Sequence, residues 1–178
     1  MHIQGVKSHS DGTGSFVMNN PWRSQLVLQN SDLNLDRDFS FTAGQLYIQG
    51  DVVITGTNQF NYTSTHAAFI DKDSTLKIDM NTTFSYGPIG SIDRTLIKMD
   101  DVTSQIFLNG CTLKSSTTGM QLTKGTLVID HKNYISNSAT GITEAIAFGD
   151  GVNDLNVEIM PGGSIEVASG QLDYMNVS

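Results

Sequence analysis

The chain has 178 residues and a formal net charge of −8, with 10 Lys and Arg residues scattered along it. This balance argues against a nucleic-acid-binding protein, because neutralising a phosphate backbone requires clustered basic side chains. No apolar stretch approaches the length of a membrane-spanning helix, and a single cysteine provides no disulfide framework.

Pairs of apolar residues spaced two apart recur in groups of three. Alternate residues of a strand face the same way, so each pair predicts a short strand with two inward side chains. The first pairs are Leu26/Leu28, Leu46/Ile48, Ala68/Ile70, Leu96/Lys98, Met120/Leu122 and Ile146/Phe148. The middle pairs are Leu33/Leu35, Val52/Ile54, Leu76/Ile78, Ile106/Leu108, Leu127/Ile129 and Val157/Ile159. The third pairs are Phe39/Phe41, Phe60/Tyr62, Phe84/Tyr86, Cys111/Leu113, Tyr134/Ser136 and Ile165/Val167.

Six successive segments each hold one such group: 24–44, 45–65, 66–94, 95–119, 120–141 and 142–170. A self-similar period of roughly 20 to 30 residues with three strands per repeat predicts an all-β fold, a single-stranded parallel β-helix or β-solenoid of six to seven coils. The usual chirality of parallel connections favours a right-handed coil. We expect one domain over 1–178, with N-terminal strands or a cap in 1–23, coils in 24–170 and an incomplete last coil in 171–178.

Acidic and amide residues recur at the turn after the middle strand. They are Asp36, Asp79, Asn109 and Asp130, with Thr55 and Met160 as departures. Asn and Asp tolerate left-handed backbone and hydrogen-bond their own turn, so a stacked row of them suits a sharp corner. The alternative is a cation or sugar site formed by the row. The structural turn ladder is favoured, because corners require these residue types in any case.

Aromatic residues occupy the third strand of neighbouring repeats: Phe39, Phe60 and Phe84, each followed two residues later by Phe41, Tyr62 or Tyr86. They share the alternation phase of the aliphatic residues elsewhere, which predicts packing in the core. An exposed aromatic row would instead bind sugar rings.

Clustered carboxylates near a lysine are the constellation that polysaccharide-cleaving enzymes need. The candidates are Asp71/Asp73, Asp100/Asp101 and Asp150/Asp154, with Lys72 and Lys98 nearby. Asp pairs in polar turns are more often solvated caps. The four histidines form no metal-ligand spacing, GDGVND (149–154) lacks calcium-loop spacing, and Cys111 is expected to be a small buried hydrophobe. We therefore expect no catalytic residue, no metal and no cofactor.

The two ends of the repeat array hold incomplete groups. The segment QLDYMNVS (171–178) provides only a first strand, whereas HIQGV (2–6) fits a middle strand and SFVMNNPWR (15–23) a third strand. A second copy's head would then complete a mixed coil with this tail, giving an open-ended fibre. The alternative is that residues 1–23 fold over the first coil. The predicted assembly interface comprises His2, Ile3, Val6, Phe16, Val17, Leu172, Tyr174, Met175 and Val177.

Patterns such as LVLQNSDLNL, LYIQGDVVIT and GTLVIDHKNY, followed by Asn/Gly turns, run through residues 24–170. In these the chain resembles the β-helical surface and adhesin-like, passenger-type repeat proteins of bacteria. The resemblance implies an extracellular or cell-surface scaffold or binding surface. Together with the incomplete ends, it leads us to expect a non-enzymatic structural protein whose partners are copies of itself, with surface glycans as a second kind of partner. The alternative is a carbohydrate-binding or carbohydrate-cleaving β-helix of the adhesin, tail-spike or lyase type.

Overall fold

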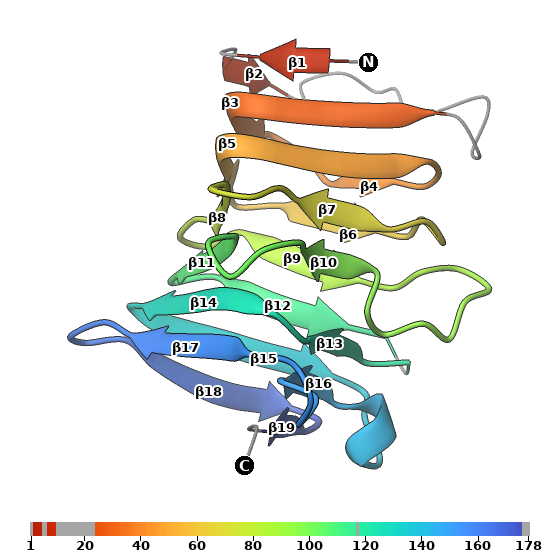
Figure 1. The fold of residues 1–178 in the computed structure, drawn as a ribbon, viewed down its shortest axis with the longest axis vertical. Coiled ribbons are helices and arrows are strands. Elements are labelled where there is room, and N and C mark those ends of the chain that lie inside the picture. The colour runs from red at the N-terminus through yellow and green to blue at the C-terminus, as the bar shows by residue number, and fades with distance from the viewer. Residues whose placement is uncertain (1, 5–6, 10–23, 117, 176–178) are drawn as a thin grey trace.

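The computed structural model describes residues 2–4, 7–9, 24–116 and 118–175, with side chains described from residue 24 onward. Within these residues the protein is all-β and built from parallel sheets. The short 3₁₀ segment η1 (Ile142–Glu144) is the one helical element of this part, where no helix is long and apolar enough to cross a membrane. In Figure 1 the strands follow one another along the long axis, and β1 (His2–Gln4) and β19 (Leu172–Tyr174) lie at opposite ends.

The strands form three columns, which we call first, middle and third after their place in each sequence repeat. The first column contains β1 (His2–Gln4), the first halves of β3 (Gln25–Leu35) and β5 (Gln45–Gly56), β7 (Ala68–Ile70), β10 (Ile97–Met99), β13 (Met120–Leu122), β16 (Ile146–Phe148) and β19 (Leu172–Tyr174). The last three strands of this column form a separate sheet.

The other two columns run alongside the first. The middle column contains β2 (Lys7–His9), the second halves of β3 and β5, β8 (Thr75–Ile78), β11 (Gln105–Asn109), β14 (Gly125–Asp130) and β17 (Leu155–Ile159). The third column contains β4 (Phe39–Phe41), β6 (Gln59–Tyr62), β9 (Thr83–Tyr86), β12 (Thr112–Ser115), β15 (Lys132–Asn137) and β18 (Ser164–Ser169). Each repeat therefore adds one parallel strand to each column.

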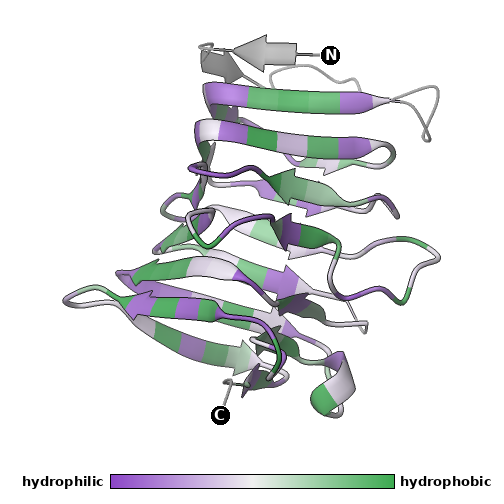
Figure 2. Ribbon diagram, viewed as in Figure 1, coloured by the Kyte–Doolittle hydropathy of each residue, from purple (hydrophilic) through white to green (hydrophobic). Residues whose placement is uncertain are grey.

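The core lies between the columns and is filled by alternate residues of the strands. In β8, for example, Leu76 and Ile78 are buried while Thr75 and Lys77 are only half-buried. Figure 2 shows the corresponding alternation of hydrophobic and hydrophilic residues along the ribbons. A period of two that buries one face is the pattern expected of a strand packed on one side.

The aromatic residues of the third column pack in the core, as their alternation predicts. Phe60 stacks on Phe84 with ring centroids 5.5 Å apart, and Tyr62 stacks on Tyr86 at 6.0 Å. Phe41, at the end of this second row, stacks on Tyr62 at 5.8 Å and is fully buried. Aromatic neighbours in register let flat rings stack on one another in the interior.

The first two repeats differ from the expectation of separate first and middle strands, because β3 and β5 each run through both columns. The bend occurs at Asn30 and Gly50, which have φ values of 45° and 64°. A side chain at Gly50 would collide with the Asn30 Oδ1 atom, which accepts a hydrogen bond from the Asp51 N–H at 3.1 Å. The corner is therefore made by one left-handed residue rather than by a loop.

Two predicted pairs are shifted by one residue. In β10 the buried residues are Ile97 and Met99, in register with Ala68 and Ile70, whereas the predicted Lys98 is exposed. In β15 the buried residues include Asn133 and Ile135, and the predicted Tyr134 lies outside. In β15 an inward position is occupied by Asn133, and a pattern of paired apolar residues does not identify a buried asparagine.

Candidate functional site

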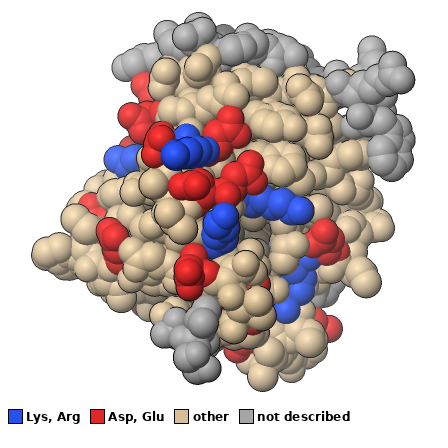
Figure 3. Space-filling view, in the orientation of Figure 1, with Lys and Arg blue, Asp and Glu red and all other residues tan. Residues whose placement is uncertain are grey.

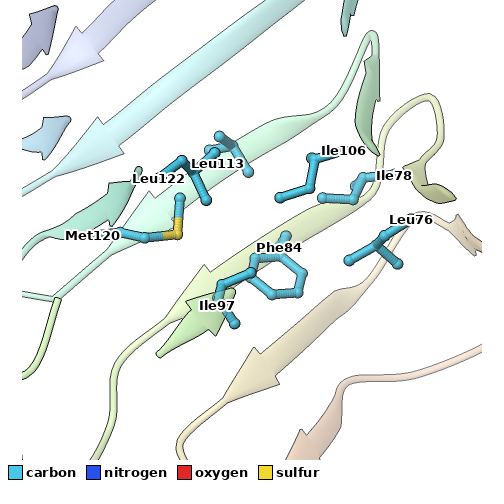
Figure 4. Close-up of a pocket in the computed structure, with 8 residues that line it drawn as sticks. All are labelled: Leu76, Ile78, Phe84, Ile97, Ile106, Leu113, Met120 and Leu122. Carbon is cyan, nitrogen blue, oxygen red and sulfur yellow. The ribbon is translucent and has the colours of Figure 1, made fainter. Parts of the chain in front are cut away.

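Figure 4 shows a cavity in the interior of the repeat stack that has no room for a ligand. The cavity there is about 10 Å³, too small to hold more than a single water molecule, and its lining is entirely apolar. The lining residues are Leu76, Ile78, Phe84, Ile97, Ile106, Leu113, Met120 and Leu122. This cavity is therefore no candidate for a ligand site.

Cys111 lies inside the stack, as expected for a small hydrophobe. It is 1% exposed, and burial raises the pKa of its thiol to about 12. Its Sγ lies 3.4 Å from Oδ1 of Asn133, which also accepts the Cys111 backbone N–H. A thiol with a raised pKa and no access is poorly suited to nucleophilic chemistry.

The carboxylate candidates lie at the corner between the first and middle columns. Lys98, Asp100, Lys124 and Asp150 line one surface groove of about 380 Å³, together with Thr95, Met99, Thr123 and Asn153. In Figure 3, Lys and Arg side chains lie among Asp and Glu side chains on this face. The sequence thus correctly places Lys98 near acidic side chains, and the structure adds Lys124.

The hydrogen bonds of Asp101 and Asp150 belong to their own turns, whereas Oδ2 of Asp71 accepts a hydrogen bond from Nε2 of Gln49 in the preceding repeat at 2.8 Å. Hydrogen bonds from the backbone N–H and hydroxyl of Thr103 lower the pKa of Asp101. Burial raises the pKa of Asp150, but hydrogen bonds from Asn153 and Val152 outweigh it and leave the pKa below its ordinary value. A general acid needs a raised pKa, so Asp101 and Asp150 are poorly suited to that role, and their hydrogen bonds cap their own turns.

Two buried serines hold this corner together from within. Ser74 Oγ accepts a hydrogen bond from the Gly50 N–H at 2.9 Å, and Ser104 Oγ donates to the Asp71 carbonyl at 2.8 Å. Each bond joins one repeat to the next. Sequence reasoning missed this serine row, although DKDS and DVTS (71–74 and 101–104) end in the same residue.

The predicted turn ladder is in register for three of its four residues. Asp79, Asn109 and Asp130 occupy the same position in successive repeats, and Nδ2 of Asn109 donates to Oδ1 of Asp79. The fourth residue needs correction, because Asn34 rather than Asp36 aligns with Thr55. Asn34 forms side-chain hydrogen bonds with both Thr55 and Asp36. Its Oδ1 accepts from the Thr55 hydroxyl, and its Nδ2 donates to Oδ1 of Asp36.

The left-handed residues of this corner lie just beyond the ladder. Asn81, Gly110 and His131 have φ values of 63°, 68° and 55°. The ladder residues themselves do not adopt the left-handed conformation. Among the described residues no group of three or more His, Cys, Asp or Glu side chains is arranged to hold a metal ion.

An inward row of mostly polar residues runs along the same corner, and of its members only Cys111 was predicted to face inward. It consists of Asn58, Thr82, Cys111 and Asn133, which occupy equivalent positions before the third strand. Asn58 Nδ2 donates to the Leu35 carbonyl at 2.8 Å, and the Thr82 hydroxyl donates to the Gly56 carbonyl at 2.8 Å. Asn58 and Thr82 thus donate hydrogen bonds to turn carbonyl groups that the strand ladders do not pair.

Outward aromatic residues form one pair on the first column, Tyr47 in β5 and Phe69 in β7. Their rings stack with centroids 5.1 Å apart and planes 21° apart. Sugar recognition by aromatic residues uses the ring face, and here each ring covers a face of the other. This geometry gives little support to a carbohydrate platform.

The C-terminal ends of the three columns form a surface of a different kind. The last strands β17, β18 and β19 pair with the preceding repeat and end their sheets. Ile159, Val167 and Tyr174 are 66%, 43% and 61% exposed. Their register partners one repeat earlier, Ile129, Ile135 and Phe148, are 2%, 0% and 3% exposed.

Equivalent positions thus differ only in whether a further layer of strands covers them. We call the outer edges of β17, β18 and β19, with Val157, Ile159, Ile165, Val167 and Tyr174, the tail surface. The two other predicted tail residues that are described, Leu172 and Met175, are half-buried. Val177 lies outside the described residues.

At the opposite end, β1 and β2 both pair with β3. Ile3 is in register with Leu28 in the first column, and Ser8 is in register with Leu33 in the middle column. The prediction that HIQGV is a middle strand is therefore wrong, since β1 is a first strand and β2 is the middle one. Val6, Phe16 and Val17 lie outside the described residues, and only the backbone of His2 and Ile3 is described.

Comparison with known proteins gives no further guide. No protein-family model, no curated protein and no solved structure matches the chain. The geometry of the tail surface is therefore the strongest indication of function that the molecule carries.

Proposed function

We propose that the protein is a right-handed parallel β-solenoid that acts as a non-enzymatic structural module and associates end to end through its tail surface. The solenoid is supported by three columns of parallel strands that each gain one strand per repeat. The resemblance to bacterial passenger-type repeat proteins supports an extracellular fibre or cell-surface layer as its setting.

The observation that carries the proposal is the contrast between the tail surface and the layer beneath it. Ile159 and Tyr174 occupy positions that are buried in the previous repeat, yet here they are exposed. Covering an aliphatic or aromatic side chain fully stabilises a complex by roughly 1.5–3 kcal/mol. Exposed sheet edges with apolar side chains are normally covered, because they pair with other strands.

The occupant that fits this surface is the head of a second copy. All strands run parallel, so a copy stacked in the same orientation continues each column, and the contact does not close on itself. Charge favours the same pairing. All ten Lys and Arg residues lie before position 133, whereas residues 133–178 contain six acidic residues. Residues 1–24 contain Lys7 and Arg23 against Asp11.

Association should depend on the tail surface. We expect the intact chain to form end-to-end particles at high concentration, visible by negative-stain microscopy and by sedimentation velocity. Ile159→Lys should weaken association at least tenfold, because it places a charge among apolar side chains opposite a basic head.

Ile92→Lys is the matched control, since Ile92 is also an isoleucine, is 90% exposed, and lies in the loop between β9 and β10 rather than in the last repeat. This variant should associate like the unchanged protein. Uniformly monomeric particles at every concentration, or an equal loss of association in both variants, would contradict the proposal.

A further inference from the structure

The ends of the columns show a mismatch that bears on how two copies join. At the tail, β19 starts a new layer in the first column, while the middle and third columns end one layer earlier, at β17 and β18. Among the described residues, the next layer therefore has a first strand but no middle or third strand.

The head supplies one strand too many for this layer. Its outermost described strands are β1 in the first column and β2 in the middle column, both paired with β3. If β2 of a second copy continues the middle column above β17, then β1 of that copy and β19 fall in the same position of the same layer. Two strands cannot occupy one position.

We propose that β1 is a placeholder for β19 of another copy: in the end-to-end joint, β1 leaves the edge of β3 and the first strand of the tail takes its position. The mixed layer then consists of β19 from one copy and β2 from the other, with β19 between its own β16 and the neighbour's β3. This inference rests on the proposed function and specifies how association is limited in the free chain.

The sequences of the two competing strands agree with this exchange. β19 has the sequence Leu-Asp-Tyr, and Leu172 and Tyr174 are in register with the buried Ile146 and Phe148 of β16. β1 has the sequence His-Ile-Gln and offers a single apolar residue, Ile3, in register with Leu28. A strand with two apolar residues on one face covers the edge of β3 better than a strand with one.

The length of the connection between β1 and β2 also suits the exchange. The two strands are separated only by positions 5 and 6 and pair with separate halves of β3, Val27–Gln29 and Asp32–Asn34. β1 has only three paired residues, so it can detach while β2 keeps its own pairing. Short strands with few pairings at the edge of a sheet open at low cost.

The test removes the competitor. Deleting residues 1–6 should leave the first half of β3 open to β19 and lower the dissociation constant for self-association at least tenfold, measured by sedimentation equilibrium. Adding Ile159→Lys to the deletion should reverse the gain, which shows that the tail surface is the site used.

A second pair of variants keeps the chain at full length in case the deletion impairs folding. Ile3→Pro removes a backbone donor and should weaken the pairing of β1, whereas Ile3→Val preserves it. We expect Ile3→Pro to associate more tightly than the unchanged chain and Ile3→Val to match it. Circular dichroism and thermal unfolding monitor the fold of each variant.

The outcomes separate the two proposals. If the deletion and Ile3→Pro associate no more tightly than the intact chain, while Ile159→Lys still weakens all of them, the placeholder role is wrong and end-to-end association stands. If no variant associates at any concentration, both proposals fail.

Discussion

At the scale of single residues, the corners of the molecule depend on buried polar side chains. Asn133 is 1% exposed, and its side chain makes four contacts with the surrounding turn. Its Nδ2 donates to the carbonyls of Asp130 and His131 at 2.8 and 3.2 Å, and its Oδ1 accepts the Cys111 N–H at 2.9 Å and faces Sγ of Cys111 at 3.4 Å.

Replacing Asn133 by alanine should therefore be strongly destabilising. The substitution leaves buried carbonyl and N–H groups without partners, and each such group costs about 1–3 kcal/mol. We expect the free energy of unfolding, measured in urea, to fall by about 2–4 kcal/mol. Asn156→Ala is the control, because Asn156 is exposed and, among the described residues, its side chain forms a hydrogen bond only with Glu158. An equal effect of the two substitutions would contradict a structural role for the polar row.

The residue scale is also where sequence reasoning was weakest. A pattern of apolar pairs predicts core positions only for apolar residues, so it does not identify the buried Asn133 and wrongly predicts that Tyr134 faces inward. Asp36 was chosen for the turn ladder because it follows the strand, although the bend at Asn30 shifts the register and brings Asn34 into the row. Both errors concern polar residues whose role depends on contacts with another repeat, which a single repeat does not reveal.

At the scale of elements, the aromatic strands combine two roles. Tyr62 and Tyr86 stack in the core, and each hydroxyl reaches a loop, where it donates to the carbonyl of His66 or Asp93. The Tyr86 hydroxyl also accepts the Leu96 N–H at 3.3 Å. In this way a buried strand anchors the loop of residues 87–96, which carries the exposed Ile89 and Ile92.

Tyr86→Phe should separate these two roles. The ring stack remains, but the carbonyl of Asp93 and the N–H of Leu96 lose their partner. We expect faster amide hydrogen exchange in residues 87–96 and a loss of about 1–2 kcal/mol in the free energy of unfolding. Tyr47→Phe is the matched control, because within the described part of the chain the Tyr47 hydroxyl donates only one long hydrogen bond, to Oε1 of the nearby Gln45 at 3.4 Å. Unchanged exchange in the loop would show that the hydroxyl does not anchor it.

Strands were more predictable than corners, because alternation with a period of two is a property of the strand alone. Leu76/Ile78, Leu127/Ile129 and the aromatic pairs were correctly placed inside. The exception in β10 follows an inserted loop, where the phase of one repeat no longer fixes the phase of the next, so Lys98 was paired with Leu96. The prediction of element boundaries fails where an inserted loop changes the length of a repeat.

At the scale of the whole molecule, each layer is stabilised mainly by the layers beside it. β11 pairs with β8 and β14, whereas β17 pairs only with β14 among the described residues. In such an array stability is approximately a sum of contacts between neighbouring layers, so the end layers open most easily. We therefore expect association to change local stability most at the two ends of the stack.

Hydrogen exchange should locate the joint directly. In the dilute intact chain, we expect the outward-pointing amides of β17 and β18 to exchange much faster than those of β11, which are paired on both sides. On association the amides of β17 and β18 should become protected, because a further strand completes their pairing.

The strand β1 should change in the opposite sense. If β19 takes its position on the edge of β3, the amides of β1 lose their partners on association and exchange faster, while the edge of β3 stays protected. Contact by any other face would protect an outward surface and leave β1 unchanged. Gain of protection in β17 and β18 together with loss in β1 is thus a signature that only the strand exchange produces.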